Sequence, residues 1–298
     1  MNQPRWIILA RHQERLDVPN PSRYPKKEYT NLQYQWFSSQ RYLQNPLDTP
    51  LTPFGEKKAR KMATHIIPYL QKQPCVIFSS PFTRCIQTAG TIQQTIFQKT
   101  GTLIPIHIEY GFTEPVILST KVVWNPKQQS FIWSKQDSSE TANQRTQSTL
   151  DHALSTKVIA ERFPQYTFQK NYKSLYHESS SSYQETLLEY ANRLKKTLDY
   201  CQSKFPHEHL ICVGHGHLIR YGTTNCMNMT LPEPYSKTCV TPGGYGMMSV
   251  LKKVGNKKRA ELSHLFISGN STIPSKSKKS SSSSSSSKST KIKKELSH

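Results

Sequence analysis

Several residues suited to phosphate chemistry each follow a short run of apolar residues. The first run is Trp6–Ala10, and it is followed at once by Arg11, His12 and Arg15. Imidazole beside guanidinium is poorly suited to metal binding but well suited to phosphate, because the arginine fork matches phosphate oxygens bidentately. Three later apolar runs are followed in the same way by Arg84, Glu114 and His215. The pattern predicts a phosphate-binding site at which a histidine acts.

The apolar runs themselves predict the strands of an α/β sheet. Runs of this kind lie at 6–10, 75–78, 104–109, 210–213, 247–251 and 262–267. Helical periods of apolar residues lie at about 53–72, 81–96 and 183–201. In such folds, ligands bind beyond the carboxyl ends of the parallel strands. We therefore predict a three-layer α/β sandwich with a mostly parallel central sheet flanked by helices, and a site at one edge of that sheet.

Two pairs of residues predict where helices begin. Thr52 is the expected N-cap of the first helix, with Pro53 at the first helical position, where its missing N–H costs nothing. Ser80 and Pro81 repeat this signal before the next helix. Pro68 falls inside the first helical period, so we expect that helix to kink or to end near residue 67.

The chain is expected to form one domain over residues 1–268, with polar insertions at about 18–48 and 115–175. The first insertion shows no sustained period of apolar residues, so we predict a long loop that lies over the cleft of the predicted phosphate site. The second contains a polar run and a short helical pattern at 154–163, and we predict an inserted cap. Residues 269–298 are rich in serine and lysine, a composition that cannot form a packed core, so we predict a disordered tail.

The charge of the chain is strongly positive, with 40 Lys and Arg residues against 19 Asp and Glu residues and a formal net charge of +21. The tail from Ser271 onward carries +6, which leaves +15 on the rest of the chain. A field of this sign attracts anions. A phosphorylated small molecule or a phosphoprotein, nucleic acid and acidic surfaces therefore all stay open as partners, as does a homodimer.

The six cysteines form no C-x-x-C pair, and several lie in apolar segments. We therefore expect reduced core thiols and an intracellular protein. No segment approaches the roughly 18 apolar residues that a membrane span requires. A cytoplasmic location follows as the expectation, and a nuclear one stays open because of the basic cluster at 252–259.

The segments around the candidate site residues form motifs. R-H-Q-E-R spans Arg11–Arg15, P-L-T-P-F-G spans Pro50–Gly55, and S-S-P-F-T-R-C-I-Q-T-A spans Ser79–Ala89. Gly111–Glu114 and Val213–Gly216 complete the set. Together they resemble the motifs of the histidine phosphatase superfamily, branch 1, which is also called phosphoglycerate mutase-like. Their form is most similar to the subgroup that contains the suppressor of T-cell signalling phosphatases and ecdysteroid phosphate phosphatase.

The chemistry of the residues and the resemblance imply the same roles. His12 would attack phosphorus and form a phosphohistidine, and nearby arginines would keep it neutral by lowering its pKa. Glu114 would protonate the leaving oxygen and then activate water. The phosphate would be held by Arg11, Arg15, Arg84 and His215. We expect no metal and no cofactor, because the arginines supply the positive charge.

Other residues near the motifs have alternative or simpler roles. Glu109 lies five residues before Glu114 and could be the acid in its place. Asp17 is expected to form a structural pair with an arginine, and His217 to point into solvent. A zinc site on His215 and His217 is disfavoured, because the nearby arginines would repel a dication.

Gln13 departs from the family pattern, which has glycine after the first histidine. If φ were positive there, glutamine would strain the phosphate loop by about 1–3 kcal/mol. The protein could then be a catalytically impaired phosphate-binding adaptor. A phosphoglycerate-type mutase, which returns the phosphoryl group to the product, is the other alternative. We favour an active phosphatase, because all the chemical residues are present.

Overall fold

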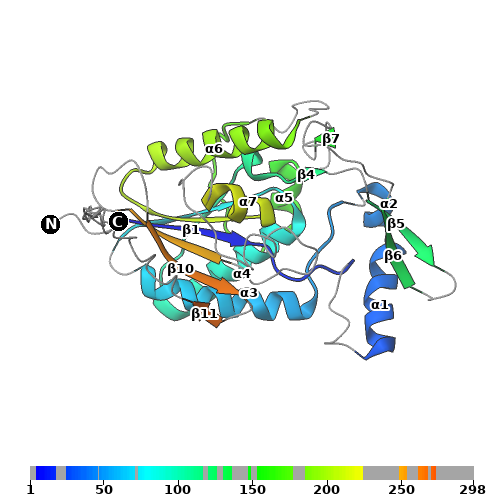
Figure 1. The fold of residues 1–298 in the computed structure, drawn as a ribbon. Coiled ribbons are helices and arrows are strands. Elements are labelled where there is room, and N and C mark those ends of the chain that lie inside the picture. Colours follow the sequence, from blue (N-terminus) through cyan, green and yellow to red (C-terminus); the bar gives the residue numbers. More distant parts are fainter. Residues whose placement is uncertain are drawn as a thin grey trace, which may run out of the picture.

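A seven-stranded sheet forms the middle layer of the computed structural model (Figure 1). The structure describes residues 5–17, 25–45, 47–70, 73–116, 120–125, 130–135, 147–148, 153–176, 185–223, 248–253, 261–267 and 270–272. In spatial order the strands are β11 (Asn270–Thr272), β10 (Glu261–Ile267), β9 (Met248–Lys253), β1 (Arg5–Arg11), β8 (His209–Gly214), β2 (Cys75–Ser79) and β3 (Ile106–Ile108).

The four strands that carry the motifs run parallel to one another. β1 pairs with β8, β8 with β2, and β2 with β3, so Ile7 lies opposite Leu210 and Ile77 opposite Ile211. The closing strand β9 is antiparallel to β1. β10 and β11 also pair antiparallel, so the sheet as a whole is mixed, whereas the predicted parallel arrangement is confirmed for the four strands that carry the motifs, which end at one common edge.

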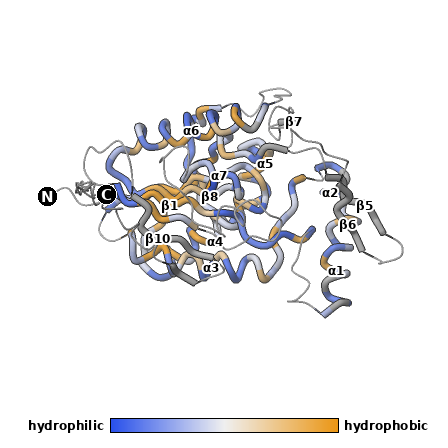
Figure 2. The backbone as a smooth tube through the Cα atoms, in the orientation of Figure 1, coloured by the Kyte–Doolittle hydropathy of each residue, from blue (hydrophilic) through white to orange (hydrophobic). Residues whose placement is uncertain are grey.

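Helices cover both faces of the sheet, which confirms the three-layer sandwich (Figure 1). α3 (Pro53–Ile66) and α4 (Thr83–Thr100) pack on the face to which β1 contributes Ile8. α6 (Leu187–Lys204) and α7 (Gly216–Tyr221) pack on the opposite face, to which β1 contributes Ile7. This alternation explains why β1 and β8 are apolar between their terminal residues (Figure 2): strands covered on both faces need no polar side.

One of the two predicted helix starts is confirmed and the other is wrong. The Thr52 side chain accepts a hydrogen bond from the Gly55 amide at 2.9 Å, as expected of an N-cap, and α3 gives way to the short 3-10 helix η2 (Ile67–Tyr69) at Pro68. The prediction for Ser80 was wrong, because α4 begins at Thr83 and is capped from a distance. There Asp48 Oδ1 accepts from the Thr83 amide at 2.6 Å.

The first insertion is more ordered than the predicted loop. It contains α1 (Lys26–Phe37) and α2 (Gln40–Gln44). α1 is polar over most of its length and is anchored by the buried side chains of Gln33, Trp36 and Phe37 near its end. Because so few of its residues are buried, it has no apolar period that sequence alone could detect.

In its described residues, the second insertion contains two small antiparallel pairs and one helix. The pairs are β4 (Pro115–Val116) with β7 (Gln147–Ser148), and β5 (Thr120–Asn125) with β6 (Ser130–Lys135). The predicted short helix is α5 (Thr156–Arg162). β6 contacts α1, so the two insertions meet beyond the carboxyl end of β1 (Figure 1). Most of the predicted polar run at 136–149 lies outside the described residues.

The sheet extends past the expected domain boundary at residue 268. β11 pairs with β10, from Asn270 opposite Ile267 to Thr272 opposite Leu265, so the folded part reaches residue 272. Residues 273–298 lie outside the described part. The four described cysteines, Cys75, Cys85, Cys201 and Cys212, are free thiols, as expected. Within the described residues, no helix has the length and apolar content needed to cross a bilayer.

Candidate active site

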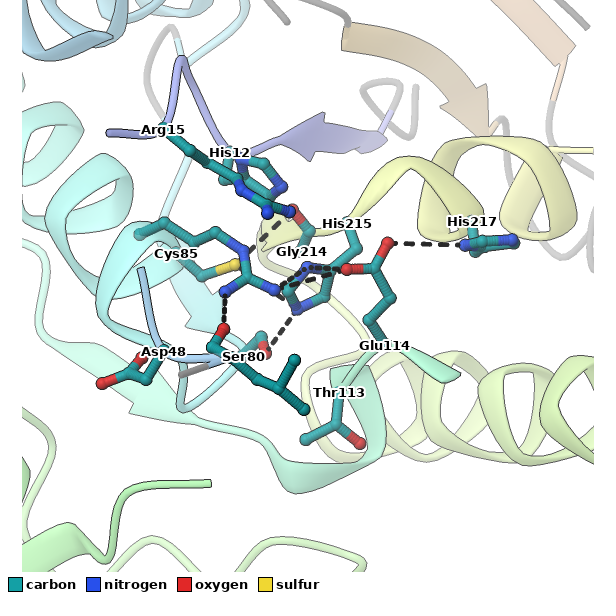
Figure 3. A network of polar contacts seen from close by, with 12 residues as sticks. His12, Arg15, Asp48, Ser80, Cys85, Thr113, Glu114, Gly214, His215 and His217 are labelled. Atoms are coloured by element: carbon teal, nitrogen blue, oxygen red, sulfur yellow. Dashed lines mark hydrogen bonds and ion pairs between the residues drawn. The ribbon is translucent and has the colours of Figure 1, made fainter. Parts of the chain in front are cut away.

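Four turns at the carboxyl edge of the sheet bring the candidate residues together (Figure 3). His12 follows β1, Arg84 lies in the first turn of α4, Glu114 follows β3 and the 3-10 helix η3 (Tyr110–Phe112), and His215 follows β8. The ring centroids of His12 and His215 are 5.4 Å apart, and both rings are buried. Arg84 Nη2 lies 3.3 Å from both Glu114 Oε2 and His215 Nδ1. One phosphate group could contact all of these side chains.

The ring of His12 is held in one orientation. Its backbone amide donates to Gly214 O at 2.8 Å, and its Nδ1 lies 2.8 Å from Gln13 O. A carbonyl can only accept, so in the neutral ring Nδ1 carries the proton and Nε2 keeps its lone pair. Burial, reinforced by the charges of Arg84 and Arg11, holds the pKa of His12 well below its usual value. His12 is therefore an uncharged imidazole with a free Nε2 at neutral pH.

The phosphate loop that carries His12 rests on the start of α3. Thr52 donates to Glu14 twice, from its amide to the backbone O at 2.9 Å and from Oγ1 to Oε1 at 3.0 Å. A Cβ at Gly55 would lie 2.5 Å from Glu14 O, which is closer than a side chain tolerates. The P-L-T-P-F-G motif therefore supports the loop.

Gln13 does not strain this loop. Among the described residues, the only non-glycine residue with positive φ is Asn171, so the φ of Gln13 is ordinary for a side-chain-bearing residue. The buried side chain of Gln13 donates from Nε2 to Arg11 O at 3.1 Å and lies against Met62 of α3. The strain that the sequence analysis considered is absent.

His215 is fixed from behind by Ser80 and Cys85. Its Nε2 lies 3.1 Å from Ser80 Oγ and 3.6 Å from Cys85 Sγ, whereas its Nδ1 lies 3.2 Å from Glu114 Oε2. Burial lowers the pKa of His215 to about 4, although the Glu114 carboxylate opposes this shift. The neutral ring therefore directs Nδ1–H to the carboxylate and accepts from the Ser80 hydroxyl at Nε2. Ser80, predicted as a helix cap, instead sets the tautomer of a site residue.

Glu114 lies between two imidazoles (Figure 3). Its Oε2 faces His215, and its Oε1 lies 3.6 Å from His217 Nδ1. Burial raises the pKa of Glu114, but His215, His217 and Arg84 outweigh it and hold that pKa well below its usual value. The prediction that His217 points into solvent was wrong, because only 12% of its side chain is exposed and it faces the carboxylate.

Glu109, the alternative acid, has a different environment. It is fully buried, and it accepts from Tyr172 Oη at 2.7 Å, Ser174 Oγ at 2.5 Å and the Gly111 amide at 3.0 Å. These bonds tie the segment at 172–175 to the sheet. Its acceptor sites are already occupied by protein donors, so Glu109 is a structural carboxylate.

The remaining arginines surround the two histidines. Arg15 forms a bidentate ion pair with Asp17, with Nε 2.8 Å from Oδ1, which confirms the structural pair expected of Asp17. The charge of Arg15 nevertheless lowers the pKa of both His12 and His215. Arg11 is buried, and its charge acts on His12 in the same direction.

Both insertions contribute an arginine beside Arg84, which sequence analysis missed. Arg41 Nη2 donates to Thr83 Oγ1 at 3.1 Å, and Arg162 Nη1 lies 3.3 Å from Asp48 Oδ2. Arg84 Nη1 itself donates to Leu47 O at 2.8 Å. No periodic pattern marks such contacts, because they join separate insertions to the start of α4.

Comparison with known proteins agrees with this arrangement. The family model "Histidine phosphatase superfamily (branch 1)" matches residues 33–115, which include Arg84 and Glu114. The ecdysone phosphate phosphatase of Bombyx mori, solved with tungstate, shares 15% identity at a TM-score of 0.52, over 86% of this chain and 93% of that chain. At this identity the likeness concerns the fold.

Two further solved structures are similar at lower TM-scores. A phosphoserine phosphatase variant from Entamoeba histolytica, solved with phosphoserine, shares 14% identity over 89% of this chain and 97% of that chain, at a TM-score of 0.42. YhfR from Bacillus stearothermophilus shares 15% identity over 89% and 96% of the two chains, at 0.44. No curated protein sequence matches the chain. The chain is therefore similar to the histidine phosphatase superfamily, branch 1, over residues 33–115, and its fold is similar to that of the Bombyx mori phosphatase.

Proposed function

We propose that this protein hydrolyses phosphomonoesters through a phosphohistidine on His12, without a metal ion. The observation that carries the proposal is the contact of 2.8 Å between His12 Nδ1 and Gln13 O. It leaves Nε2 as the unprotonated nitrogen, next to the Arg84 and His215 donors that a phosphate needs. The substrate class is a phosphorylated small molecule or a phosphoprotein.

The first step would transfer the phosphoryl group to the protein. His12 Nε2 attacks phosphorus in line, the bond from phosphorus to the ester oxygen breaks, and protonated Glu114 gives its proton to that oxygen. Guanidinium and imidazole N–H groups hold the other phosphate oxygens, where negative charge spreads in the transition state. A donor of this kind is typically worth about 3 kcal/mol.

The second step would return the site to its starting state. Water attacks the phosphohistidine, the bond between phosphorus and Nε2 breaks, and the Glu114 carboxylate takes the proton from water. Inorganic phosphate leaves, and His12 regains its free Nε2.

Glu114 must be protonated in the first step, although its pKa is low in the free protein. A bound phosphate draws the donors of Arg84 and His215 away from the carboxylate and adds negative charge beside it. Both effects raise the pKa of Glu114 on binding. We therefore expect greater activity at acidic than at alkaline pH.

The test is the hydrolysis of p-nitrophenyl phosphate in the presence of EDTA. We expect turnover that EDTA leaves unchanged and that His12→Ala abolishes, and His207→Ala, which changes an exposed histidine, serves as the matched control. Equal turnover in the His12 variant would reject the proposal. An isomerisation assay with phosphoglycerate distinguishes a mutase, and salt-sensitive polyanion binding without turnover would indicate an adaptor.

A further inference from the structure

The turn that carries Glu114 lies unusually close to helix α6. A Cβ at Gly111 would lie 2.1 Å from Thr197 Oγ1, so only glycine permits this approach of backbone to helix. Thr197 lies one helical turn after Arg193 on the same face of α6. The turn is therefore seated on a small patch of α6 formed by Arg193 and Thr197.

Arg193 directs its whole guanidinium group to this turn and to one carboxylate. Its Nη1 donates to Gly111 O at 2.7 Å and to Thr113 Oγ1 at 3.1 Å, and its Nη2 donates to Thr113 O at 3.3 Å. Its Nε and Nη2 donate to the two carboxylate oxygens of Glu185. Arg193 and Glu185 are both buried, with 5% and 1% of their side chains exposed.

A buried ion pair of this kind gives little net stability, because the desolvation of both charges offsets their attraction. Its geometric effect is larger, since a planar guanidinium with five donors fixes several acceptors at once. Here the acceptors are two carbonyls and a hydroxyl of the three residues that precede Glu114. The ion pair of Arg193 and Glu185 therefore fixes the backbone position that carries the Glu114 side chain.

Arg193 also supports, through packing, the imidazole on the other side of the Glu114 carboxylate. The guanidinium carbon of Arg193 lies 4.8 Å from the ring centroid of Tyr190, and the Tyr190 ring packs edge-on against His217 at 5.7 Å. His217 in turn faces Glu114 Oε1. Arg193 thus supports both the backbone of Glu114 and one of its imidazole neighbours.

We propose that Arg193, held by Glu185, is the positioning residue for Glu114 as the acid of the reaction. This role rests on the proposed function. Misplacement of a reacting group by about 1 Å can lower a rate on the order of a hundredfold. Loss of the clamp should therefore lower the rates of both steps that use Glu114, while substrate binding by the arginines persists.

The experiment compares two substrates with different needs for an acid. An alkyl phosphate such as ethyl phosphate needs a proton on its leaving oxygen, whereas p-nitrophenol leaves readily without one. We expect Arg193→Lys to lower kcat/KM for the alkyl phosphate by at least about tenfold, because kcat/KM reports the transfer to His12 and excludes the later hydrolysis, which also uses Glu114 but is common to both substrates. For the aryl phosphate the decrease in kcat/KM should stay below about threefold. Glu114→Gln should show the same difference between substrates.

Two further variants complete the test. Arg60→Lys changes an arginine that is exposed and paired with Glu56 on α3, and it should leave both substrates unaffected. Thr113→Val removes one acceptor of Arg193 and leaves the buried ion pair intact, so it gives the answer even if Arg193→Lys does not fold. We expect Thr113→Val to show a smaller difference in the same direction. Thermal unfolding establishes that each variant is folded.

The outcomes separate the two proposals. If Glu114→Gln distinguishes the substrates but neither folded clamp variant does, the positioning role of Arg193 is overturned and the proposed function stands. An equal decrease in kcat/KM for both substrates in the clamp variants would also overturn it, because the loss would then not depend on the need for an acid. If Glu114→Gln itself fails to distinguish the substrates, the assignment of the acid falls, and the role of Arg193 falls with it.

Discussion

Single residues set the charge state of the site, and they do so through burial as much as through charge. The imidazoles of His12 and His215 are buried beside arginines, so the pKa of each is lowered and the rings are uncharged at neutral pH. The pKa of Glu114 is lowered too, which for a carboxyl group means that it is ionised. A neutral nucleophile and a carboxylate that regains its proton when phosphate binds are the two states that a two-step transfer needs.

His217 should help to lower the pKa of Glu114, the proposed acid of the reaction. It stabilises the ionised form of Glu114, so replacing it with Phe should raise the pKa of Glu114. The acid would then stay protonated to higher pH, and the alkaline limb of kcat for an alkyl phosphate should move upward. The ring of Phe preserves the stacking on Tyr221. A pH–rate profile measures this shift, and an unchanged alkaline limb would show that His217 does not act on the acid.

Gln13 should matter for stability more than for rate. We expect Gln13→Gly to lower the free energy of unfolding by about 1–3 kcal/mol, because a buried hydrogen bond and packing are lost and the unfolded chain gains freedom. The turnover number should change by less than about threefold, because the backbone at this position is unstrained. Urea unfolding and steady-state kinetics measure the two effects. A large gain in turnover would mean that glutamine impairs the loop after all.

Strands and helices place these residues. Several of these elements could be predicted, because their apolar residues follow the pattern typical of a buried strand or an amphipathic helix. The elements whose side chains form much of the core show this apolar pattern in the sequence, and they are β1, β2, β8, α3 and α6. α1 was missed because few of its residues are buried, and the start of α4 because its cap, Asp48, comes from a distant segment. Arg193 was missed, and His217 was wrongly expected to face solvent, for the same reason: their partners are set by tertiary contacts.

The start of α3 should be intolerant of any side chain at Gly55. Gly55→Ala places a Cβ against Glu14 O, and backbone cannot move aside as a flexible side chain can. We expect a loss of about 1–3 kcal/mol in the free energy of unfolding. A decrease in turnover should accompany it, since Glu14 belongs to the loop that carries His12. Unfolding and kinetic measurements on one preparation test this prediction. A wild-type free energy of unfolding together with a wild-type turnover number would show that the loop can move to accept the Cβ.

The whole molecule combines a positive net charge with a core that contains uncharged histidines. The charge of +21 favours anionic partners at long range, and the two insertions meet beyond the carboxyl end of β1. The gathering of the motif residues at one edge of the sheet followed from strand-end reasoning, whereas the order of the strands was not predicted. The shape of the insertions did not, because polar segments pack through contacts that no period records.

Global stability should fall in mild acid. Burial lowers the pKa of His209 to about 4, and its Nδ1 accepts from the Trp6 amide at 3.1 Å. The unfolded chain takes up this proton near pH 6.5 but the folded chain only near pH 4, so stability is full above pH 6.5 and is lost as pH falls toward 4. Between pH 7 and 5 we expect His209 to account for about 2 kcal/mol of this loss.

Urea unfolding of the wild type and of His209→Gln at the two pH values measures this contribution. The variant should be less stable at pH 7 but should lose less stability on acidification. An equal loss in both proteins would show that His209 is not neutral in the fold.

The most direct test of the central claim is rapid quenching of the protein during turnover, followed by mass spectrometry of its peptides. We predict one phosphoryl group on the peptide that contains His12, stable in base, labile in acid and absent from His12→Ala. Steady hydrolysis with no phosphorylated His12 peptide at any quench time, or with the phosphoryl group on another residue, would contradict the account.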